Sequence, residues 1–391
     1  MKIKIGVIFG GTSVEHEVSI ITAVQAMEHM NKEKYDIYPI YIAKDRTWYT
    51  GKMLMDIDLY KDFHDLKKYA KKSVLFNRNG AFTLQSLGPF KQIIADLDIV
   101  FPIVHGNNVE DGSLQGYLEM VGVPYVGSNV LGSALGQDKV IQKQIFEQLK
   151  LPIVPYTWFY DNAYFDKKEN ILKNVNKIGY PVIVKPATLG SSVGITYVKD
   201  ENDLDKAIKD AATYDIKVVV EKAVENLVEV NCSVLGNYEH QQVSELEEVM
   251  SNEEFLTYKE KYCGGKKGAV SKGMASLNRI IPARIDEKLA DNIRKTSKEA
   301  FKALNLSGIC RLDYLIDTKT KKFYINEPNT IPGSLAFYLW TPTGKTYEQL
   351  LDEAITIAIK QYKTKHSKTF SFETNILHNF SGLKGIKGLK K

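Results

Sequence analysis

Two oxygen-bearing side chains stand close together in residues 321–340, which read KKFYINEPNTIPGSLAFYLW. Glu327 and Asn329 lie two positions apart at the end of an apolar run, and residues i and i+2 of a strand share one face. Pro332 and Gly333 then turn the chain. This spacing predicts a strand that ends in a carboxylate beside a carboxamide, with a tight turn just beyond it.

A third oxygen ligand comes from the preceding predicted strand, CRLDYLI, which carries Asp313 beside Arg311. The segment DTKTKK between the two strands predicts a hairpin that places Asp313 next to Glu327 and Asn329. Two carboxylates and one amide oxygen are hard ligands, which suit Mg²⁺ that bridges nucleotide phosphates. Neither His nor Cys stands at the spacing of a zinc site. Each acid taken singly is more often a surface group, but the set together favours a metal site.

A loop of small residues, KPATLGSSVGI (residues 185–195), follows a predicted buried strand. Its glycines let backbone N–H groups close over phosphates, Ser191 and Ser192 add donors, and Lys185 adds positive charge. A plain hairpin with a surface lysine is the alternative, and the downstream metal pattern favours the phosphate loop. The two common nucleotide motifs are absent: GxGxxG does not follow the first strand, and the GKT at 344–346 lacks the first glycine of a P-loop.

The chain divides into three predicted domains and a tail. Strands and helices alternate over residues 1–137, as in IKIGVIF, VSIITAVQAMEHM and YDIYPIYIA, which predicts an α/β domain with a doubly wound parallel sheet. Residues 138–222 form a smaller α+β unit that contains the lysine-glycine loop. Residues 223–364 contain a polar loop at 250–279 and the metal-site hairpin. Residues 365–391 are a basic tail.

The composition is that of a cytoplasmic globular protein, with 391 residues of which 44% are hydrophobic and 25% charged. No apolar run reaches the ~18 residues needed to cross a membrane, and the N-terminus lacks the pattern of a signal peptide. The three cysteines form no CxxC, which suits a reducing compartment. The formal charge of +5 is concentrated in residues 363–391, which hold seven lysines and one glutamate. We therefore expect neither a nucleic-acid nor a membrane partner.

These motifs resemble those of the D-alanine–D-alanine ligases of the ATP-grasp superfamily, from residue 3 to about residue 360. Eight blocks occur in the family's order: GGTSVEHEVS, HGNNVEDGSLQGYLEMVGVPYVGS, ALGQDKV, GYPVIVKPATLGSSVGI, EKAVENLVEVNCSVLG, KEKY, GICRLDY and NEPNTIPGS. The resemblance implies an ATP-grasp fold of mixed α/β and α+β class, with a small central lid domain and a C-terminal domain that holds the metals. It further implies ATP and D-alanine as substrates, two Mg²⁺ or Mn²⁺ ions, and a homodimer through the N-terminal domains.

The resemblance also assigns roles to single residues of this chain. It assigns ATP binding to Lys139, Lys185, Ser191, Ser192, Glu221, Lys222, Val224, Glu229 and Lys261. It assigns the metal ions to Asp313, Glu327 and Asn329. It assigns amino-acid binding to Glu15, His105, Lys261, Ser334, Tyr338 and Leu339. It assigns catalysis to Glu15, Ser191, Tyr262, Arg311 and Gly333.

The implied reaction has two steps. The carboxylate of the first D-alanine attacks the γ-phosphate of ATP and becomes an acyl phosphate, and the amine of the second D-alanine then displaces phosphate. Arg311 and the Gly333 N–H stabilise the oxyanion of the second step. The loop that carries Lys261 and Tyr262 closes over the site and excludes water. The product is D-alanyl-D-alanine for peptidoglycan precursors.

Two positions bear on the choice of acceptor, and Val109, which stands where glycine is frequent, bears on the pocket of the first substrate. Direct alignment puts Tyr338, in the run SLAFYLW, where the family usually has a serine that binds the carboxylate of the second substrate. Tyr262 favours an amine acceptor over a hydroxy acid. The acceptor is therefore D-alanine, or alternatively D-serine or another amino acid in a reshaped pocket. A nucleotide-binding regulator on an inactive scaffold is disfavoured, because all the expected catalytic positions are filled.

Overall fold

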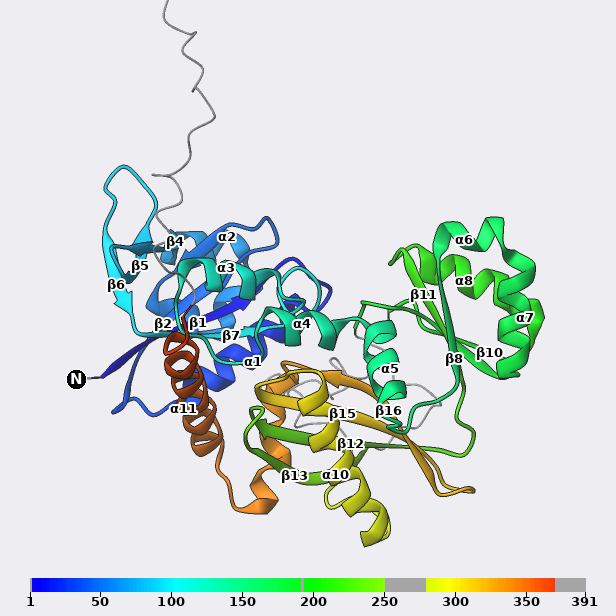
Figure 1. Ribbon diagram of the computed structural model, residues 1–391. Coiled ribbons are helices and arrows are strands. Elements are labelled where there is room, and N and C mark those ends of the chain that lie inside the picture. The colour runs from blue at the N-terminus through cyan, green and yellow to red at the C-terminus, as the bar shows by residue number, and fades with distance from the viewer. Residues whose placement is uncertain (1, 191–192, 250–278, 370–391) are drawn as a thin grey trace, which may run out of the picture.

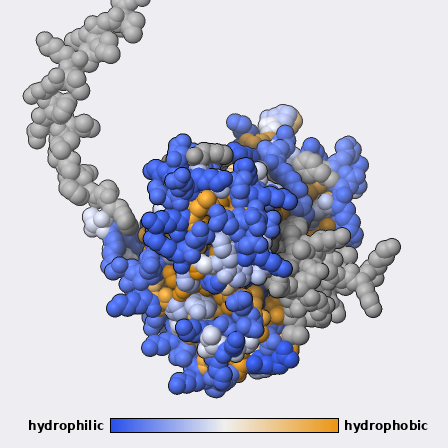
Figure 2. All heavy atoms as spheres, turned by 90° about the vertical axis from the view of Figure 1, so that its right-hand side faces the viewer, coloured by the Kyte–Doolittle hydropathy of each residue, from blue (hydrophilic) through white to orange (hydrophobic). Residues whose placement is uncertain are grey.

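Three β-sheets with helices packed against them build the fold (Figure 1). The computed structural model describes residues 2–190, 193–249 and 279–369. The predicted mixed α/β class is confirmed. The face that Figure 2 shows is mostly hydrophilic, with apolar residues in small groups between the charged ones. No helix within the described ranges is long and apolar enough to span a membrane.

The first sheet has seven strands in the order β6-β5-β4-β3-β2-β1-β7. Its strands are β1 Ile3–Gly10, β2 Tyr35–Ile42, β3 Trp48–Thr50, β4 Lys71–Arg78, β5 Ala81–Ser86, β6 Ile93–Leu97 and β7 Ile99–Val104. The helices of this part are α1 His16–His29, α2 Phe63–Tyr69, α3 Ser113–Val121 and α4 Val130–Gln137. β7 is buried along its whole length, as expected for a strand covered on both faces.

Only the β2-β1-β7 part of this sheet is parallel, which differs from the expected fully parallel sheet. The other neighbours pair antiparallel. The β2–β3, β4–β5 and β5–β6 connections are too short for the crossover that parallel strands need, whereas the longer β3–β4 connection contains α2. Asn79 and Gly80 turn the chain in a hairpin between β4 and β5, and both turn residues have positive φ. The segment VPYVG (residues 123–127) forms only a bridge between Val100 and Tyr125.

The second sheet is antiparallel, with the order β10-β9-β11-β8. Its strands are β8 Tyr156–Tyr160, β9 Val182–Pro186, β10 Thr196–Val198 and β11 Lys217–Lys222. Helices α6 Asp161–Asp166, α7 Lys168–Ile178 and α8 Leu204–Ala212 accompany it. α7 and α8 bury their apolar faces, such as Val175 and Ile208, against Val184 and Val218 of the sheet. Strands and helices thus combine in this part of the chain, as the predicted α+β unit requires.

The third sheet is also antiparallel and has the order β14-β13-β12-β15-β16. Its strands are β12 Leu227–Gly236, β13 Gln241–Val249, β14 Arg279–Ile280, β15 Gly308–Asp317 and β16 Lys322–Asn329. Helix α10 Glu287–Ala303 covers its apolar face, where Phe301 packs with Leu246, Leu312 and Ile325. Helix α11 Tyr347–His366 follows the 3₁₀ segment η5 Gly333–Leu339 and packs beside the first sheet's core.

Helix α5 Lys139–Gln148 connects the first sheet to the second (Figure 1). Asp138 caps it by accepting hydrogen bonds from the N–H groups of Val140 and Ile141. Phe146 of α5 belongs to the core of the third sheet, although α5 falls inside the predicted central domain. The predicted boundaries at 137/138 and 222/223 lie between the sheets, and the predicted tail is described only as far as residue 369.

Candidate active site

The predicted metal-site hairpin exists, and it belongs to a polar row across the third sheet. Asp313 of β15 pairs directly with Glu327 of β16 on one side and with Asn231 of β12 on the other. Asn231 in turn pairs with Glu247 of β13. Directly opposite residues of antiparallel strands point to the same face. Four polar side chains therefore lie in one line on the face opposite α10.

A second row lies two residues further along, with Arg311 between Asn329 and Ser233. The Arg311 guanidinium binds Asp313 in a fork, with Nε 2.7 Å from Oδ1 and Nη2 2.8 Å from Oδ2. Asn329 Nδ2 donates to Asp313 Oδ2 at 3.0 Å. Asp313 raises the pKa of Arg311 despite its burial. Arg311, Asp313 and Asn329 are therefore in direct contact.

Two predicted phosphate-binding lysines face these strands from α5 and β9. Lys139 Nζ lies 3.0 Å from Glu327 Oε2 and donates to the Leu189 carbonyl at 2.9 Å. Lys185 Nζ lies 2.8 Å from Glu221 Oε2 and donates to Asn326 Oδ1 at 3.3 Å. Both side chains are buried, so their charges act in a medium where water screens them weakly.

A third buried lysine, Lys143, was missed by the sequence analysis. Its Nζ lies 3.2 Å from Glu221 Oε1, so Glu221 stands between two lysines. Burial lowers the pKa of Lys143, whereas the two lysines lower the pKa of Glu221 despite its burial. The sequence could have indicated Lys143, because Lys139 and Lys143 are four positions apart and so share one face of a helix.

A cavity of about 90 Å³ lies between the second and third sheets. Seven residues expected at an ATP or metal site line it: Lys185, Glu221, Lys222, Val224, Glu229, Asp313 and Glu327. Lys222 directs its Nζ elsewhere, to the carbonyls of Gly179 and Tyr180. The lining combines apolar side chains, such as Ile183 and Leu315, with charged ones, which suits a nucleotide, whose base is flat and whose phosphates are anionic.

A second cavity, of about 50 Å³, adjoins the first. It is lined by seven residues expected at the site: Glu15, His105, Lys139, Arg311, Glu327, Asn329 and Gly333. Gly190 and Glu327 line both cavities, so the two cavities meet at these residues. The phosphoanhydride of a nucleotide in the first cavity would therefore lie next to a substrate held in the second one. A Cβ on Gly190 would come within 3.0 Å of Glu15 Oε2, and only glycine allows this approach without displacement.

Two buried titratable groups shape the second cavity. His105 Nε2 lies 3.3 Å from Thr22 Oγ1, and burial lowers the pKa of His105 to about 4. Glu110 accepts bonds from the Gly106 N–H and from Thr330 and Ile331, and burial with help from Glu15 raises its pKa to about 7. Glu110 was not expected at the site, since two of its three partners, Thr330 and Ile331, lie 220 and 221 positions away.

The predicted acceptor segment lies in η5. Ser334 donates its N–H to Thr22 Oγ1 at 3.0 Å and its hydroxyl to Gln25 Oε1 at 2.8 Å. Tyr338 donates its hydroxyl to Glu247 Oε1 at 3.2 Å, and the Leu339 side chain is fully buried. Four predicted residues lie outside the described ranges: Ser191, Ser192, Lys261 and Tyr262.

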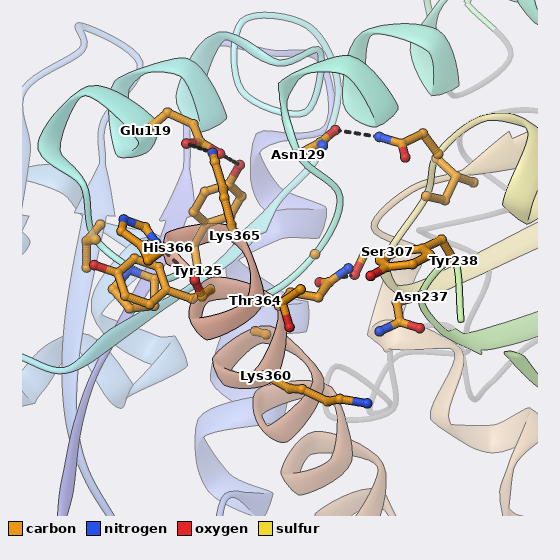
Figure 3. A pocket seen from close by; sticks show the side chains of 18 of the residues that line it. Glu119, Tyr125, Asn129, Asn237, Tyr238, Ser307, Lys360, Thr364, Lys365 and His366 are labelled. Atoms are coloured by element: carbon orange, nitrogen blue, oxygen red, sulfur yellow. Dashed lines mark hydrogen bonds and ion pairs between the residues drawn. The ribbon is translucent and has the colours of Figure 1, made fainter. Parts of the chain in front are cut away.

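A larger cavity, of about 490 Å³, lies elsewhere, between the α3–α4 region, the β12–β13 turn and α11 (Figure 3). Lys365 of α11 bonds Glu119 of α3 across it, and Ser307 donates to Gln361 Oε1. None of the expected site residues that the structure describes lines this cavity. Proximity to the lysines and carboxylates, rather than size, therefore makes the two smaller cavities the candidate active site.

Comparison with known proteins bears on this assignment. Two family models match the chain, "D-ala D-ala ligase N-terminus" over residues 4–128 and "D-ala D-ala ligase C-terminus" over residues 145–356. The D-alanine–D-alanine ligase of Thermosipho melanesiensis is 42% identical over 377 residues, which cover 96% of this chain and 98% of that protein. That of Thermoanaerobacter sp. is 39% identical over 371 residues, covering 93% and 98%.

Solved structures agree with the sequence matches. The D-alanine–D-alanine ligase of Coxiella burnetii has a TM-score of 0.79 at 28% identity, covering 94% of this chain and 96% of that one. The VanG D-Ala:D-Ser ligase of Enterococcus faecalis has a TM-score of 0.76 at 31% identity, covering 92% and 100%. This chain has the ATP-grasp fold of these neighbours, and it belongs to the D-alanine–D-alanine ligase family.

Proposed function

We propose that this protein is an ATP-dependent, ADP-forming ligase that joins two D-alanines into D-alanyl-D-alanine for peptidoglycan precursors. The observation that carries the proposal is the junction of the two cavities at Gly190 and Glu327. There Lys139 and Lys185 face the oxygen ligands from one side, and Arg311 faces them from the other. The junction combines groups for a nucleotide phosphate with groups for a reacting carboxylate.

In the first step Glu15 binds the ammonium group of the first D-alanine, and His105 lines the wall of that pocket. The donor carboxylate attacks the γ-phosphate, and Lys139, Lys185 and Ser191 bind the phosphate oxygens. Phosphorylation gives a free carboxylate the leaving group that it lacks. Glu221, Lys222, Val224 and Glu229 hold the adenosine part, and Ser192 joins the phosphate loop.

The side chains of Asp313, Glu327 and Asn329 would hold the magnesium ions. Their positions fit such a group, because the two carboxylates are directly opposite each other on neighbouring strands, Asn329 contacts Asp313, and all three residues line the two cavities. The set consists of two carboxylates and one amide. Within the described ranges, no group of three or more His, Cys, Asp or Glu residues is placed to hold a metal ion. Bound Mg²⁺ supplies charge neutralisation for the phosphoryl group and would compete with Lys139 and Arg311 for the carboxylates.

In the second step the amine of the second D-alanine attacks the acyl carbon and inorganic phosphate leaves. Arg311 and the Gly333 N–H stabilise the oxyanion, and loss of one such donor costs on the order of 10²–10³ in rate. Ser334, Tyr338 and Leu339 form the wall beside the acceptor. Lys261 and Tyr262 belong to the loop that excludes water, because an acyl phosphate hydrolyses when water reaches it.

The three domains (residues 1–137, 138–222 and 223–364) enclose the substrates between them. The protein acts in the cytoplasm as a homodimer through its N-terminal domains, and exposed apolar residues on α3 and α4, such as Met120 and Leu131, support that assembly. Sedimentation of the purified protein tests the dimer. D-serine is not favoured as the acceptor, because the sequence relatives named above are D-alanine–D-alanine ligases.

Phosphate release from the purified protein with ATP, Mg²⁺ and a panel of amino acids tests the function. D-Alanine alone should give phosphate and D-alanyl-D-alanine in equal amounts. D-Serine with D-alanine, and L-alanine alone, are the comparison reactions. The proposal fails if D-alanine alone gives no phosphate while another pair does.

A further inference from the structure

Glu247 ends the polar row at the side opposite the metal ligands, and three donors surround it. Asn231 Nδ2 donates to Oε1 at 2.8 Å, and the Tyr338 hydroxyl donates to the same oxygen at 3.2 Å. Arg279 Nη1 lies 3.2 Å from Oε2. The Glu247 side chain is only 3% exposed, so this carboxylate is fixed by its partners and not by water.

Tyr338 therefore has no proton left for a substrate. A phenol carries one proton, and the proton of Tyr338 is already donated to Glu247. A substrate carboxylate accepts hydrogen bonds and cannot donate them. Tyr338 can therefore contribute a flat wall beside the acceptor, but the donor for an acceptor carboxylate has to come from another residue.

Arg279 is that residue by position and by chemistry. Its guanidinium carbon lies 3.8 Å from the centre of the Tyr338 ring, a stacked contact that orients the guanidinium plane. The side chain is 11% exposed. Within the described part of the chain, the buried Nε and Nη1 atoms find no hydrogen-bond partner of good geometry, although Nη1 is ion-paired with Glu247. A guanidinium carries five N–H donors, so it can serve Glu247 and a second carboxylate together.

The order of residues along the row places this arginine on the acceptor side. Glu327 and Asp313 lie next to the nucleotide cavity, Asn231 follows, and Glu247 comes last. Neighbouring strands are about 4.8 Å apart, so Glu247 lies roughly 10 Å from Asp313, two strands away. Arg311 lies two residues from Asp313 on β15 and interacts electrostatically with Tyr338 and with Glu247. An acceptor amino acid whose amine reaches the acyl carbon of the acyl phosphate, next to Arg311, would extend its carboxylate toward Arg279.

We propose that Arg279, held by the Tyr338 ring and by Glu247, binds the carboxylate of the acceptor amino acid and so selects acceptors that carry one. The inference rests on the proposed function and deepens it. It also explains how the run SLAFYLW serves an amino-acid acceptor, because the aromatic side chain positions an arginine in place of donating a hydrogen bond itself.

The experiment combines one change in the protein with one in the acceptor. Wild type and Arg279→Gln are assayed with D-alanine at a low concentration that saturates the donor pocket. The acceptor is then either additional D-alanine or D-alaninamide, which lacks the carboxylate. Each product is measured by chromatography. Wild type should prefer D-alanine, and Arg279→Gln should lose roughly 10- to 100-fold in kcat/KM for D-alanine, a loss typical of a charged hydrogen bond. Its kcat/KM for D-alaninamide should change by less than about 3-fold.

Two control variants sharpen the result. Arg284→Gln removes an arginine that forks onto Glu248, the next residue of β13, and should leave the ratio of the two acceptors unchanged. Tyr338→Phe removes the hydroxyl and keeps the ring, so it should weaken both acceptors alike and preserve their ratio. A loss confined to D-alanine in Tyr338→Phe, or equal losses for both acceptors in Arg279→Gln, would overturn the inference.

The donor half-reaction separates this inference from the proposed function. Hydroxylamine traps an acyl phosphate as D-alanine hydroxamate and needs no acceptor carboxylate. Arg279→Gln should form the hydroxamate at the wild-type rate. If wild type itself forms neither hydroxamate nor dipeptide, the proposed function fails and the role of Arg279 fails with it. If wild type forms both and Arg279→Gln keeps its preference for D-alanine, only the role of Arg279 is refuted.

Discussion

Glu110 and Thr330 join the first sheet's loops to the strand end that carries the proposed metal site. Thr330 Oγ1 donates to Glu110 Oε1 at 2.7 Å, and the Ile331 N–H donates to the same oxygen at 2.9 Å. The other oxygen accepts from the Gly106 N–H at 2.9 Å, next to His105. One carboxylate therefore fixes the donor pocket relative to the turn at Gly333.

The first prediction concerns the pH dependence that Glu110 gives to stability. Its pKa is raised to about 7 by burial and by Glu15, so the folded state holds the proton more tightly than the unfolded state. The stability from Glu110 is complete below its ordinary pKa and is lost as pH rises through about 7. The free energy of unfolding of wild type minus that of Glu110→Gln should fall by up to about 3 kcal/mol between pH 4.5 and 8. Urea unfolding at stepped pH measures it, and a difference independent of pH contradicts the prediction.

The second prediction is an opposite pH dependence for His105. Burial lowers the pKa of His105 to about 4, so the folded state disfavours the charged imidazole. Its contribution is complete above the ordinary histidine pKa and is lost as pH falls toward 4. In His105→Gln the loss of stability on acidification should be smaller than in wild type, again by up to about 3 kcal/mol. The same unfolding series measures it, and a steeper acid loss in the variant would refute the assignment.

The third prediction tests how closely α4 approaches the strand end. A Cβ on Gly136 of α4 would lie 2.2 Å from Thr330 Cγ2, and Thr330 is held in place by Glu110. Gly136→Ala should therefore destabilise the fold by about 1–3 kcal/mol and raise the KM for D-alanine. Gly116 of α3 is the matched control, because a Cβ there meets nothing within 4 Å. Gly116→Ala should stabilise by up to about 1 kcal/mol, and equal midpoints of thermal unfolding for both variants would contradict this account.

The hairpin of the metal site could be predicted from sequence because it is local. The segment DTKTKK connects β15 to β16, and alternation within each strand puts Asp313, Glu327 and Asn329 on one face. Lys143 could have been found as well, by its helical spacing from Lys139. Strand β13 was not predicted, because two of its buried residues are glutamates, Glu247 and Glu248, which a hydrophobic pattern does not mark.

The contacts between distant segments could not be predicted from sequence. Glu110 and Thr330 are 220 positions apart, and Tyr338 and Glu247 are 91 apart. Neither pair has a periodicity or a short motif that joins its members. The alignment indicated that Tyr338 stands at the acceptor site, but only the packing shows that its hydroxyl is used by Glu247 and that Arg279 stacks on its ring.

The fourth prediction concerns the assigned metal ligands. Glu327→Gln removes a carboxylate that faces Asp313 and Lys139, so Mg²⁺ should bind less tightly and neutralise the phosphoryl group less well. Turnover should fall by at least about 10²-fold, and half-maximal activity should need more Mg²⁺. Phosphate release across a Mg²⁺ titration measures both. Glu287→Gln, an exposed carboxylate on α10, is the control that should match wild type. Unchanged turnover in Glu327→Gln would remove Glu327 from the metal site.

The fifth prediction compares two members of the buried charge cluster at the nucleotide cavity. Glu221 lies between Lys143 and Lys185, at 3.2 and 2.8 Å, and all three are almost completely buried. Glu221→Gln leaves two buried lysines facing each other without an anion, and removal of one partner from a buried pair typically costs about 3–5 kcal/mol. Lys143→Met leaves the Glu221–Lys185 pair intact and replaces the ammonium with an apolar group of similar length, so its cost should be clearly smaller.

Urea unfolding without nucleotide separates the two variants, because it measures stability apart from ATP binding. Glu221→Gln should have the lower midpoint of the pair. It should also raise the KM for ATP more than Lys143→Met does, since Lys185 then loses the carboxylate that orients its ammonium toward the phosphates. A Lys143→Met variant as unstable as Glu221→Gln would mean that Lys143, rather than Lys185, is the main counter-ion of Glu221. Lys185 would then be held chiefly by Asn326 and free to turn toward ATP.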